Sequence, residues 1–225
     1  VDGCRTITKV EDGVVSFFTR NNKIIPLTFE PLLQTLKQLP SGTYDGELVM
    51  LRDKKVLSRK EGNGLINALI KGSNIPPTLE PHLILWDVVG SEPYHERWGQ
   101  LQDLAKPLNC PWVSLVETRI VSDYNEAMTH YQELRKRGEE GSILKNLAGL
   151  WVPKRSQDLC KLKGEYTGEF QVVGWDQGTG KNAGRLGSIK VISQDREVEC
   201  WVGTGFSDQQ REEYTADFIV GSLVE

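Results

Sequence analysis

Short apolar and alternating segments recur along the chain, and most of them end at turn signals such as Glu11-Asp12-Gly13 and Pro40-Ser41-Gly42. Such runs predict strands, because successive side chains of a strand face opposite sides of a sheet. The expected strands are Thr6–Val10, Val14–Thr19, Gly46–Leu51, His82–Val89, Gly141–Leu144, Cys160–Lys163, Phe170–Trp175 and Gly187–Ile192. The pattern therefore predicts a sheet-rich protein.

Three longer segments follow helical spacing instead. They are Phe29–Gln38, Pro93–Lys106 and Asp123–Arg137. In the second, Leu101, Leu104 and Leu108 share one face, and in the third Asp123 and Glu126 resemble an N-terminal capping pair. With one further short helix around residues 208–214, the pattern predicts the α+β class.

The helical pattern stops after Lys163, and the next segment, Gly164-Glu165-Tyr166-Thr167-Gly168, has the composition of a hinge. The residues after this segment are predicted to form hairpins. We therefore expect two domains, residues 1–164 and residues 165–225, and the sequence contains no internal repeat.

Composition favours an ordinary globular protein over a membrane-spanning or secreted one. The chain has 225 residues, of which 38% are hydrophobic and 26% charged, as in ordinary globular proteins. No apolar run approaches the roughly 20 residues that span a bilayer, and no charged-then-apolar leader opens the sequence. We therefore expect a cytoplasmic protein that is not secreted and has no membrane partner. The net charge of −4 still permits a local basic surface that binds nucleic acid.

The cysteines are widely scattered and form no C-x-x-C pair, so neither a zinc site nor a disulfide framework is expected. They are Cys4, Cys110, Cys160 and Cys200. We expect them to be reduced, and mostly core thiols.

Candidate chemistry begins at the first residues, Val1-Asp2-Gly3-Cys4-Arg5, which match K-x-D-G-x-R without its lysine. Other pieces follow in a fixed order: Thr19-Arg20-Asn21, Asp45-Gly46-Glu47-Leu48, Leu85-Trp86-Asp87, Glu140-Gly141-Ser142-Ile143-Leu144-Lys145 and Lys161-Leu162-Lys163. Each piece alone has an ordinary explanation: a turn, a core aromatic residue or the solvated face of a strand. The ordered combination is what carries information.

Together these pieces resemble the motif series of the covalent nucleotidyltransferase superfamily, and the run Gly168–Trp175 resembles the entry to the OB domain of ATP-dependent DNA ligases. Segment Ser58–Leu69 resembles the small phage and bacterial branch. The resemblance implies an adenylation domain of antiparallel sheets flanked by helices, followed by a C-terminal OB-fold β-barrel. It also implies a nucleophilic lysine directly before Val1, part of the first domain upstream of that residue, and an OB domain that is incomplete at its C-terminus.

In this family a lysine amine attacks the α-phosphate of ATP, the AMP passes to a DNA 5′-phosphate, and a 3′-hydroxyl displaces it to seal a nick. Such displacements at phosphorus need positioning and charge neutralisation more than covalent help from the protein. The amine must be neutral to attack, so the pKa of that lysine must fall from its usual value of about 10.4.

The resemblance assigns roles to particular side chains. Glu47 and Glu140 are expected to hold Mg²⁺, and Glu47 also to contact the ribose. Lys145, Lys161 and Lys163 are expected at the α-phosphate, Trp86 stacked on the adenine, and Arg5 and Arg20 at ribose and phosphate groups. The residues expected to be catalytic are Asp2, Arg5, Lys161 and Lys163.

Strand alternation adds geometry to these roles. Asp45 and Glu47 are two apart and should share a face, as should Lys161 and Lys163, which leaves Cys160 and Leu162 for the opposite, core face. Glu140 and Lys145 are an odd number of residues apart. They therefore share a face only if the strand is twisted or bulged, and otherwise their roles are separate.

The loop Gly178-Thr179-Gly180-Lys181-Asn182 suggests a phosphate loop, but it fails the Walker pattern and is better interpreted as a hairpin loop. In the ligase interpretation, Lys181 and Arg185 contact DNA phosphates, which gives salt-dependent binding without sequence preference. A solvated basic turn is the alternative.

The resemblance implies nicked double-stranded DNA as partner, ATP and Mg²⁺ as cofactors, and a monomer. The cysteine and helix-hairpin elements of NAD-dependent ligases are missing from this sequence. RNA ligases and mRNA-capping nucleotidyltransferases share the motif series, but the OB entry and the arginine of the first motif favour DNA ligase. A nick-binding fragment that cannot adenylate itself is the non-enzymatic alternative.

Overall fold

The computed structural model describes residues 3–108, 110–164 and 167–225. The chain divides into two compact units, Val1–Gly164 and Glu165–Glu225, each with its own hydrophobic core. The expected hinge over residues 164–168 includes residues 165 and 166, which lie outside the described residues.

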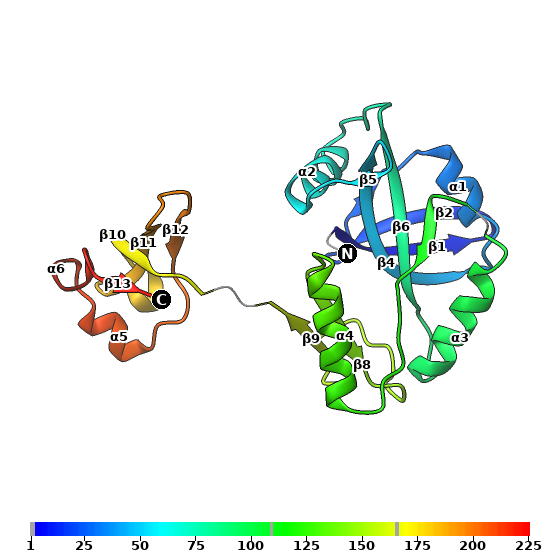
Figure 1. The fold of residues 1–225 in the computed structure, drawn as a ribbon. Coiled ribbons are helices and arrows are strands. Elements are labelled where there is room, and N and C mark those ends of the chain that lie inside the picture. Colours follow the sequence, from blue (N-terminus) through cyan, green and yellow to red (C-terminus); the bar gives the residue numbers. More distant parts are fainter. Residues whose placement is uncertain (1–2, 109, 165–166) are drawn as a thin grey trace. The chain divides into compact units, whose positions relative to one another are not determined.

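The first unit is built on a seven-stranded sheet (Figure 1). Its strands are β1 (Cys4–Glu11), β2 (Val14–Thr19), β3 (Ile24–Ile25), β4 (Gly42–Arg52), β5 (Lys55–Val56), β6 (Leu79–Val88) and β7 (Val113–Leu115). The order is β3-β2-β1-β4-β6-β7, with β5 paired to β4. Only β6 and β7 run parallel among these described pairs. The long β4 lies between β1 and β6, and all three carry residues of the expected motifs.

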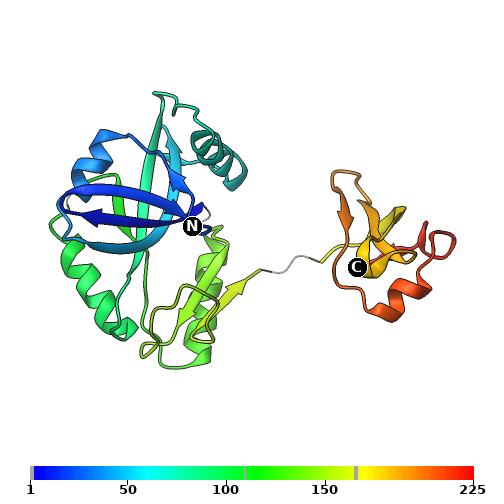
Figure 2. The same ribbon diagram turned by 180° about the vertical axis from the view of Figure 1, so that it is seen from behind.

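Three helices bury their apolar sides in the core of this sheet: α1 (Glu30–Leu36), α2 (Arg59–Ile70) and α3 (Tyr94–Ala105). Leu32 and Leu36 of α1, Ile66 of α2 and Leu101 of α3 belong to one buried cluster with Leu48 of β4. In both views α2 lies at the opposite end of the unit from α1 and α3 (Figures 1 and 2). None of the helices in the described ranges is long and apolar enough to cross a membrane.

Helix α2 was not predicted from the sequence. Gly62 and Gly64 lie inside it, and glycine lowers helix propensity by about 1 kcal/mol relative to alanine. Packing compensates, because Ile66 and Leu69 are buried. A start signal was present, however: the Ser58 hydroxyl accepts a hydrogen bond from the Glu61 amide and donates one to the Glu61 carboxylate.

A smaller two-stranded sheet follows, formed by β8 (Gly141–Lys145) and β9 (Leu159–Lys163). Helix α4 (Tyr124–Lys136) packs against β8. The predicted cap of this helix is confirmed, because the Asp123 carboxylate accepts from the Glu126 amide at 2.9 Å.

The cysteine expectation is partly wrong. All four thiols are free, but Cys160 and Cys200 are exposed and the other two are half-buried. Cys160 was expected on a core face of its strand. A two-stranded sheet cannot bury both strands deeply, and Leu162 is the only half-buried side chain of β9.

The second unit holds a four-stranded antiparallel sheet in the order β12-β11-β10-β13. Its elements are β10 (Phe170–Gln177), the 3₁₀ turn η1 (Gly180–Asn182), β11 (Leu186–Ser193), β12 (Glu199–Val202), α5 (Asp208–Glu213), α6 (Ala216–Ile219) and β13 (Leu223–Val224). The α+β class with antiparallel sheets is confirmed. The described strands do not close into a barrel, because β12 and β13 pair only with the inner strands.

Candidate functional site

The first group of site residues lies where β1 and β4 run side by side. Arg5 lies directly opposite Glu47 and donates a bidentate pair of hydrogen bonds to Asp45, Nε to Oδ1 at 3.0 Å and Nη2 to Oδ2 at 2.6 Å. Glu47 accepts from the Gly3 amide at 2.9 Å. Asp45 and Glu47 therefore share the face of the sheet opposite Leu48, as their two-residue spacing predicts. The bonds from Arg5 hold Asp45, whose side chain is 2% exposed.

A β-bulge at Trp86 brings β6 into the same group. Gly46 pairs with Leu85 while Asp45 pairs with Asp87, so β6 contains one extra residue at this point. Paired residues face the same side, which places Leu85 in the core and Asp87 on the face of Asp45. Gly46 is required beside the bulge, because a Cβ there would lie 2.5 Å from the Ile84 carbonyl oxygen.

Asp87 is the centre of a buried ionic cluster. Arg97, on α3, donates to both of its carboxylate oxygens at 2.9 and 3.1 Å. Lys145, on β8, approaches the same carboxylate at 3.4 Å, donates to the Trp86 carbonyl at 3.2 Å and lies over the Tyr94 ring, 4.1 Å from its centroid. The cluster thus fixes β8 against the bulged end of β6.

Lys145 is the most enclosed of the expected phosphate-binding lysines, with 18% of its side chain exposed. Burial lowers the pKa of its ammonium group, while the carboxylates of Asp87 and Asp45 act in the opposite direction. The pKa of Arg5 is raised, mainly by its hydrogen bond to Asp45, and the charge of Asp87 contributes to this rise. The two groups of residues therefore form one electrostatic unit.

The lysines of β9 lie on the same side of the small sheet as Lys145. Register pairs Lys145 with Leu159 and Ile143 with Lys161, so alternation puts Lys145, Lys161 and Lys163 on one face. Lys161 donates to Glu140 at 2.7 Å, and this bond lowers the pKa of the Glu140 carboxyl group.

Glu140 and Lys145 are five residues apart, and the start of β8 explains how both can lie near the lysines of β9. Strand β8 begins at Gly141, so its alternation does not extend to Glu140. Gly141 has φ 155°, and a Cβ there would lie 2.0 Å from the Leu162 carbonyl oxygen. This irregular start lets the Glu140 carboxylate reach Lys161.

The remaining expected residues are less closely linked. Asp2 lies outside the described residues. Arg20 is exposed in the turn between β2 and β3, and Trp86 is half-buried at the bulge. In the second unit, Lys181 pairs with Asp208 at 3.5 Å and Arg185 with Glu212 at 3.1 Å, both across to α5.

The carboxylates expected to hold Mg²⁺ fit that ion in chemistry. Glu47 and Glu140 supply hard oxygen donors, and Mg²⁺ binds through one or two carboxylates together with water and phosphate oxygens. In the structure each contacts a donor, Gly3 or Lys161. No group of three or more His, Cys, Asp or Glu side chains among the described residues forms a ready-made metal cage.

Sequence reasoning gave no role to Asp87, Arg97, Tyr94 or Trp151, whose indole Nε1 donates to Asp45 at 3.3 Å. A signal existed for two of them. Asp87 follows an apolar strand, and Arg97 lies on the apolar side of α3, one turn before Leu101. Charged residues at such positions are rarely buried unless they are paired.

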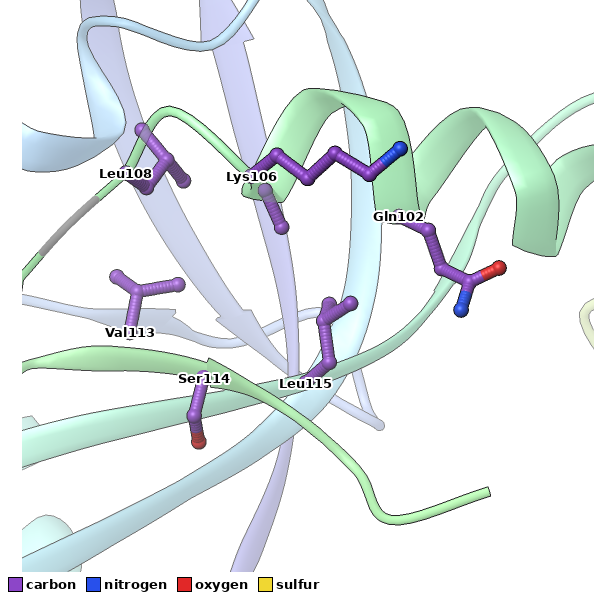
Figure 3. A pocket seen from close by; sticks show the side chains of 7 residues that line it. Gln102, Lys106, Leu108, Val113, Ser114 and Leu115 are labelled. Atoms are coloured by element: carbon purple, nitrogen blue, oxygen red, sulfur yellow. The ribbon is translucent and has the colours of Figure 1, made fainter. Parts of the chain in front are cut away.

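A small cavity of about 260 Å³ lies elsewhere, between the end of α3 and β7. Figure 3 shows Leu108, Val113 and Leu115 around it, with Lys106 and Gln102 at its side. Its lining contains no carboxylate and none of the motif residues. It is therefore separate from the candidate site.

Comparison with known proteins gives a consistent result. Residues 1–163 match the model of the ATP dependent DNA ligase domain. The DNA ligase of Enterobacteria phage T4 is 28% identical over 163 residues, which cover 68% of this chain and 33% of that protein. The multifunctional non-homologous end joining protein LigD of Pseudomonas aeruginosa is 30% identical over 225 residues, covering 92% of this chain and 25% of that protein. The chain thus spans about a third or less of these relatives.

Solved structures agree. A structure from a study of Lig E DNA ligases, whose subject is DNA binding with a minimal scaffold, superposes with a TM-score of 0.78 at 25% identity. The match covers 100% of this chain and 81% of that chain. The similarity therefore extends over both compact units.

Proposed function

Because this chain belongs to the ATP-dependent DNA ligase domain family, we propose that it forms the ATP-activating and nick-sealing part of a DNA ligase. The observation that carries the proposal is the buried junction of β4, β6 and β8, where Asp45, Asp87 and Lys145 meet beside the lysine-bearing face of β9. Carboxylates and cations fixed in this way suit displacement at phosphorus, because preorganised charges stabilise the transition state.

The proposed reaction has three balanced steps. A lysine amine directly before Val1 attacks the α-phosphorus of ATP; a P–N bond forms, pyrophosphate leaves and the amine loses a proton. The DNA 5′-phosphate then attacks the same phosphorus; the P–N bond breaks and the lysine leaves as an amine that takes up a proton. The 3′-hydroxyl finally attacks the DNA 5′-phosphorus and loses its proton; the phosphodiester forms and AMP leaves.

Residues of this chain would position the groups that react. Lys145 is held by Asp87 and the Trp86 carbonyl, so its charge is fixed at the junction. Lys161 and Lys163 would place two further cations at the α-phosphate. Glu47 and Glu140 would hold Mg²⁺, which neutralises phosphate charge when bound.

Other roles complete the proposal. Trp86 would stack on the adenine, and Arg5 and Arg20 would contact ribose or phosphate oxygens, with Asp2 close to the nucleophile. Residues 1–164 would be the adenylation domain, and residues 165–225 part of an OB-fold domain. We propose that the protein acts as a monomer in the cytoplasm on nicked duplex DNA.

The test uses two versions of the chain, one with lysine and one with arginine placed before Val1. After incubation with ATP and Mg²⁺, mass spectrometry of the intact lysine version should show a gain of one AMP, and pyrophosphate should be released. The arginine version should gain nothing, because guanidinium stays protonated. Equal results for both versions would refute the lysyl-AMP mechanism, and sealing of a nicked RNA duplex but not a nicked DNA duplex would refute the substrate.

A further inference from the structure

A cluster of cations lies at the far end of β4 from Asp45. It comprises Arg52, Lys54, Lys55, Arg59 and Lys60, which we call the basic patch. All five are exposed. Residues 52–61 carry five cations against two carboxylates, a net charge of +3 in a chain of net charge −4. Positive charge is therefore concentrated here against the overall balance.

The turn at the tip of the patch has two non-glycine residues in the left-handed backbone region. Asp53 and Lys54 join β4 to β5 with φ values of 50° and 62°. Such two-residue turns favour glycine or asparagine, because a side chain is strained at positive φ. A lysine at this strained position suggests a use for its charge at the tip.

The start of α2 also departs from the usual preference. Arg59 and Lys60 occupy its first turn, where the helix dipole already places partial positive charge and cations are unfavourable. Among the described residues, Arg52, Lys54, Lys55 and Lys60 form no ion pair. Lys181 and Arg185 of the second unit, by contrast, pair with Asp208 and Glu212 of α5. Glu61 of the same turn attracts Arg52, but the helix dipole still disfavours the charges of Arg59 and Lys60.

The basic patch adjoins the candidate site. Arg59 is close enough to help lower the pKa of Glu140. Both views show the start of β1 between α2 on one side and β8 with β9 on the other (Figures 1 and 2). The start of α2 and the lysine-bearing strand β9 therefore lie on two sides of the start of β1, and Arg59 is the member of the patch whose charge acts on Glu140.

The composition of the patch fits the regularly spaced phosphates of a nucleic-acid duplex. Segment 52–61 contains no aromatic residue that could stack on a base, and Val56 is its only strongly exposed apolar side chain. This composition disfavours single-stranded nucleic acid, which is bound by stacking, and favours a duplex backbone, which is bound by charge.

We propose that the basic patch binds backbone phosphates of duplex DNA about five base pairs from the nick, an inference that rests on the proposed function. Arg52 is five positions after Glu47 along β4, a distance of about 17 Å at roughly 3.3 Å per residue. Phosphates on one strand are about 3.4 Å apart along the axis, so this span corresponds to about five base pairs.

The test compares K54Q/K55Q with a control of equal charge change, K37Q/K106Q. Lys37 and Lys106 are exposed at the ends of α1 and α3, away from α2 in both views. Binding of each protein to a nicked duplex is measured across a salt series. Loss of two phosphate contacts should reduce the slope of log K against log salt by about two and weaken binding roughly 10- to 100-fold near 0.1 M salt. The control should match the parent.

A second substrate locates the contact. Uncharged methylphosphonate linkages replace phosphates about four to six base pairs from the nick, on each side in turn. On one side the parent should lose affinity and K54Q/K55Q should lose almost none, because its contacts are already absent. Equal losses for the two proteins on both sides would refute the proposal.

Three further outcomes separate this inference from the proposed function and from a membrane contact. If the lysine version of the parent gains AMP and seals nicks but K54Q/K55Q keeps the parental salt slope, the basic patch is not a DNA contact. If K54Q/K55Q binds the nicked duplex normally and loses only binding to vesicles of anionic phospholipid, the patch serves a membrane surface and the inference is wrong. If the lysine version of the parent does not gain AMP but the slope falls as expected, the proposed function fails and the DNA contact stands.

Discussion

At the scale of single residues, Lys145 shows how the fold controls a charge. Its ammonium group is held between a carboxylate, a backbone carbonyl and the face of Tyr94, with little access to solvent. Desolvation disfavours the charged form, so the pKa of Lys145 is lowered from its ordinary value of 10.5. This shift links protonation of Lys145 to the stability of the first unit.

The sign of that link gives a prediction. Below the lowered pKa, Lys145 is protonated in both folded and unfolded chains, and its burial penalty is fully present. Between the lowered pKa and 10.5, the unfolded chain binds more protons, so this group makes the free energy of unfolding rise with pH. The penalty is fully relieved only above the unfolded value.

Lys145→Met should remove this contribution. Urea unfolding from neutral pH to about 10.5 should therefore show the parent gaining stability relative to the variant as the pH rises. Lys154→Met, at an exposed position, should run parallel to the parent. A constant difference between parent and Lys145→Met over the whole range would contradict the lowered pKa.

At the scale of elements, α3 and β6 are joined by a buried ion pair. Arg97 is 2% exposed, and besides its two bonds to Asp87 it donates to the carbonyls of Glu92 and Gly149. It therefore ties the start of α3, the end of β6 and the loop after β8 together. Without it, Lys145 would be the one ion-pair partner of the Asp87 carboxylate among the residues that the structure describes.

Arg97→Met should accordingly destabilise the first unit by about 3–5 kcal/mol, the usual effect of removing one partner of a buried pair. Urea unfolding followed by tryptophan fluorescence measures this. Arg97→Lys should recover only part of the loss, because lysine cannot make the bidentate contact. Arg137→Met, at an exposed pair with Glu117, is the control and should change stability much less. Similar small effects for Arg97 and Arg137 would contradict a structural role for the buried pair.

The elements also show what sequence alone could predict. Alternation and turn signals located β1, β2, β4, β6, β8, β9, β10 and β11, because these patterns are local, but they missed the short strands β3, β5, β7, β12 and β13. The bulge at Trp86 and the irregular start of β8 depend on pairing partners far along the chain, so local patterns could not reveal them. For the same reason the motifs predicted roles for Glu47, Glu140 and Lys145 but none for Arg97 or Trp151, whose contacts join distant segments.

At the scale of the whole molecule, the chain consists of two units with separate cores, and the residues expected to contact DNA in the second unit are paired with α5. Exposed ion pairs of this kind contribute little free energy, so DNA phosphates can compete with α5 for the two cations. Neutralising Lys181 and Arg185 together should weaken nicked-duplex binding and lower its salt slope by about one unit for each lost contact.

Formation of the AMP adduct by the same double variant should stay near the parental rate, because the residues proposed to activate ATP lie in the first unit. Single-turnover adenylation of the lysine version and a salt series with a nicked duplex provide the two measurements. Equal damage to both would mean that the loop helps to activate ATP. Normal results in both would identify it as a solvated turn.

The extra residue in β6 shifts the alternation of side chains between the two faces of the sheet by one position. Leu83 and Leu85 point into the core, and regular alternation would point Asp87 there as well. The bulge turns Asp87 to the opposite face instead. The face to which Asp87 points depends on the number of residues in the strand and not on which side chain occupies position 86. The bulge thus adds a side-chain position beside the site, and a substitution of Trp86 should leave the direction of the Asp87 carboxylate unchanged.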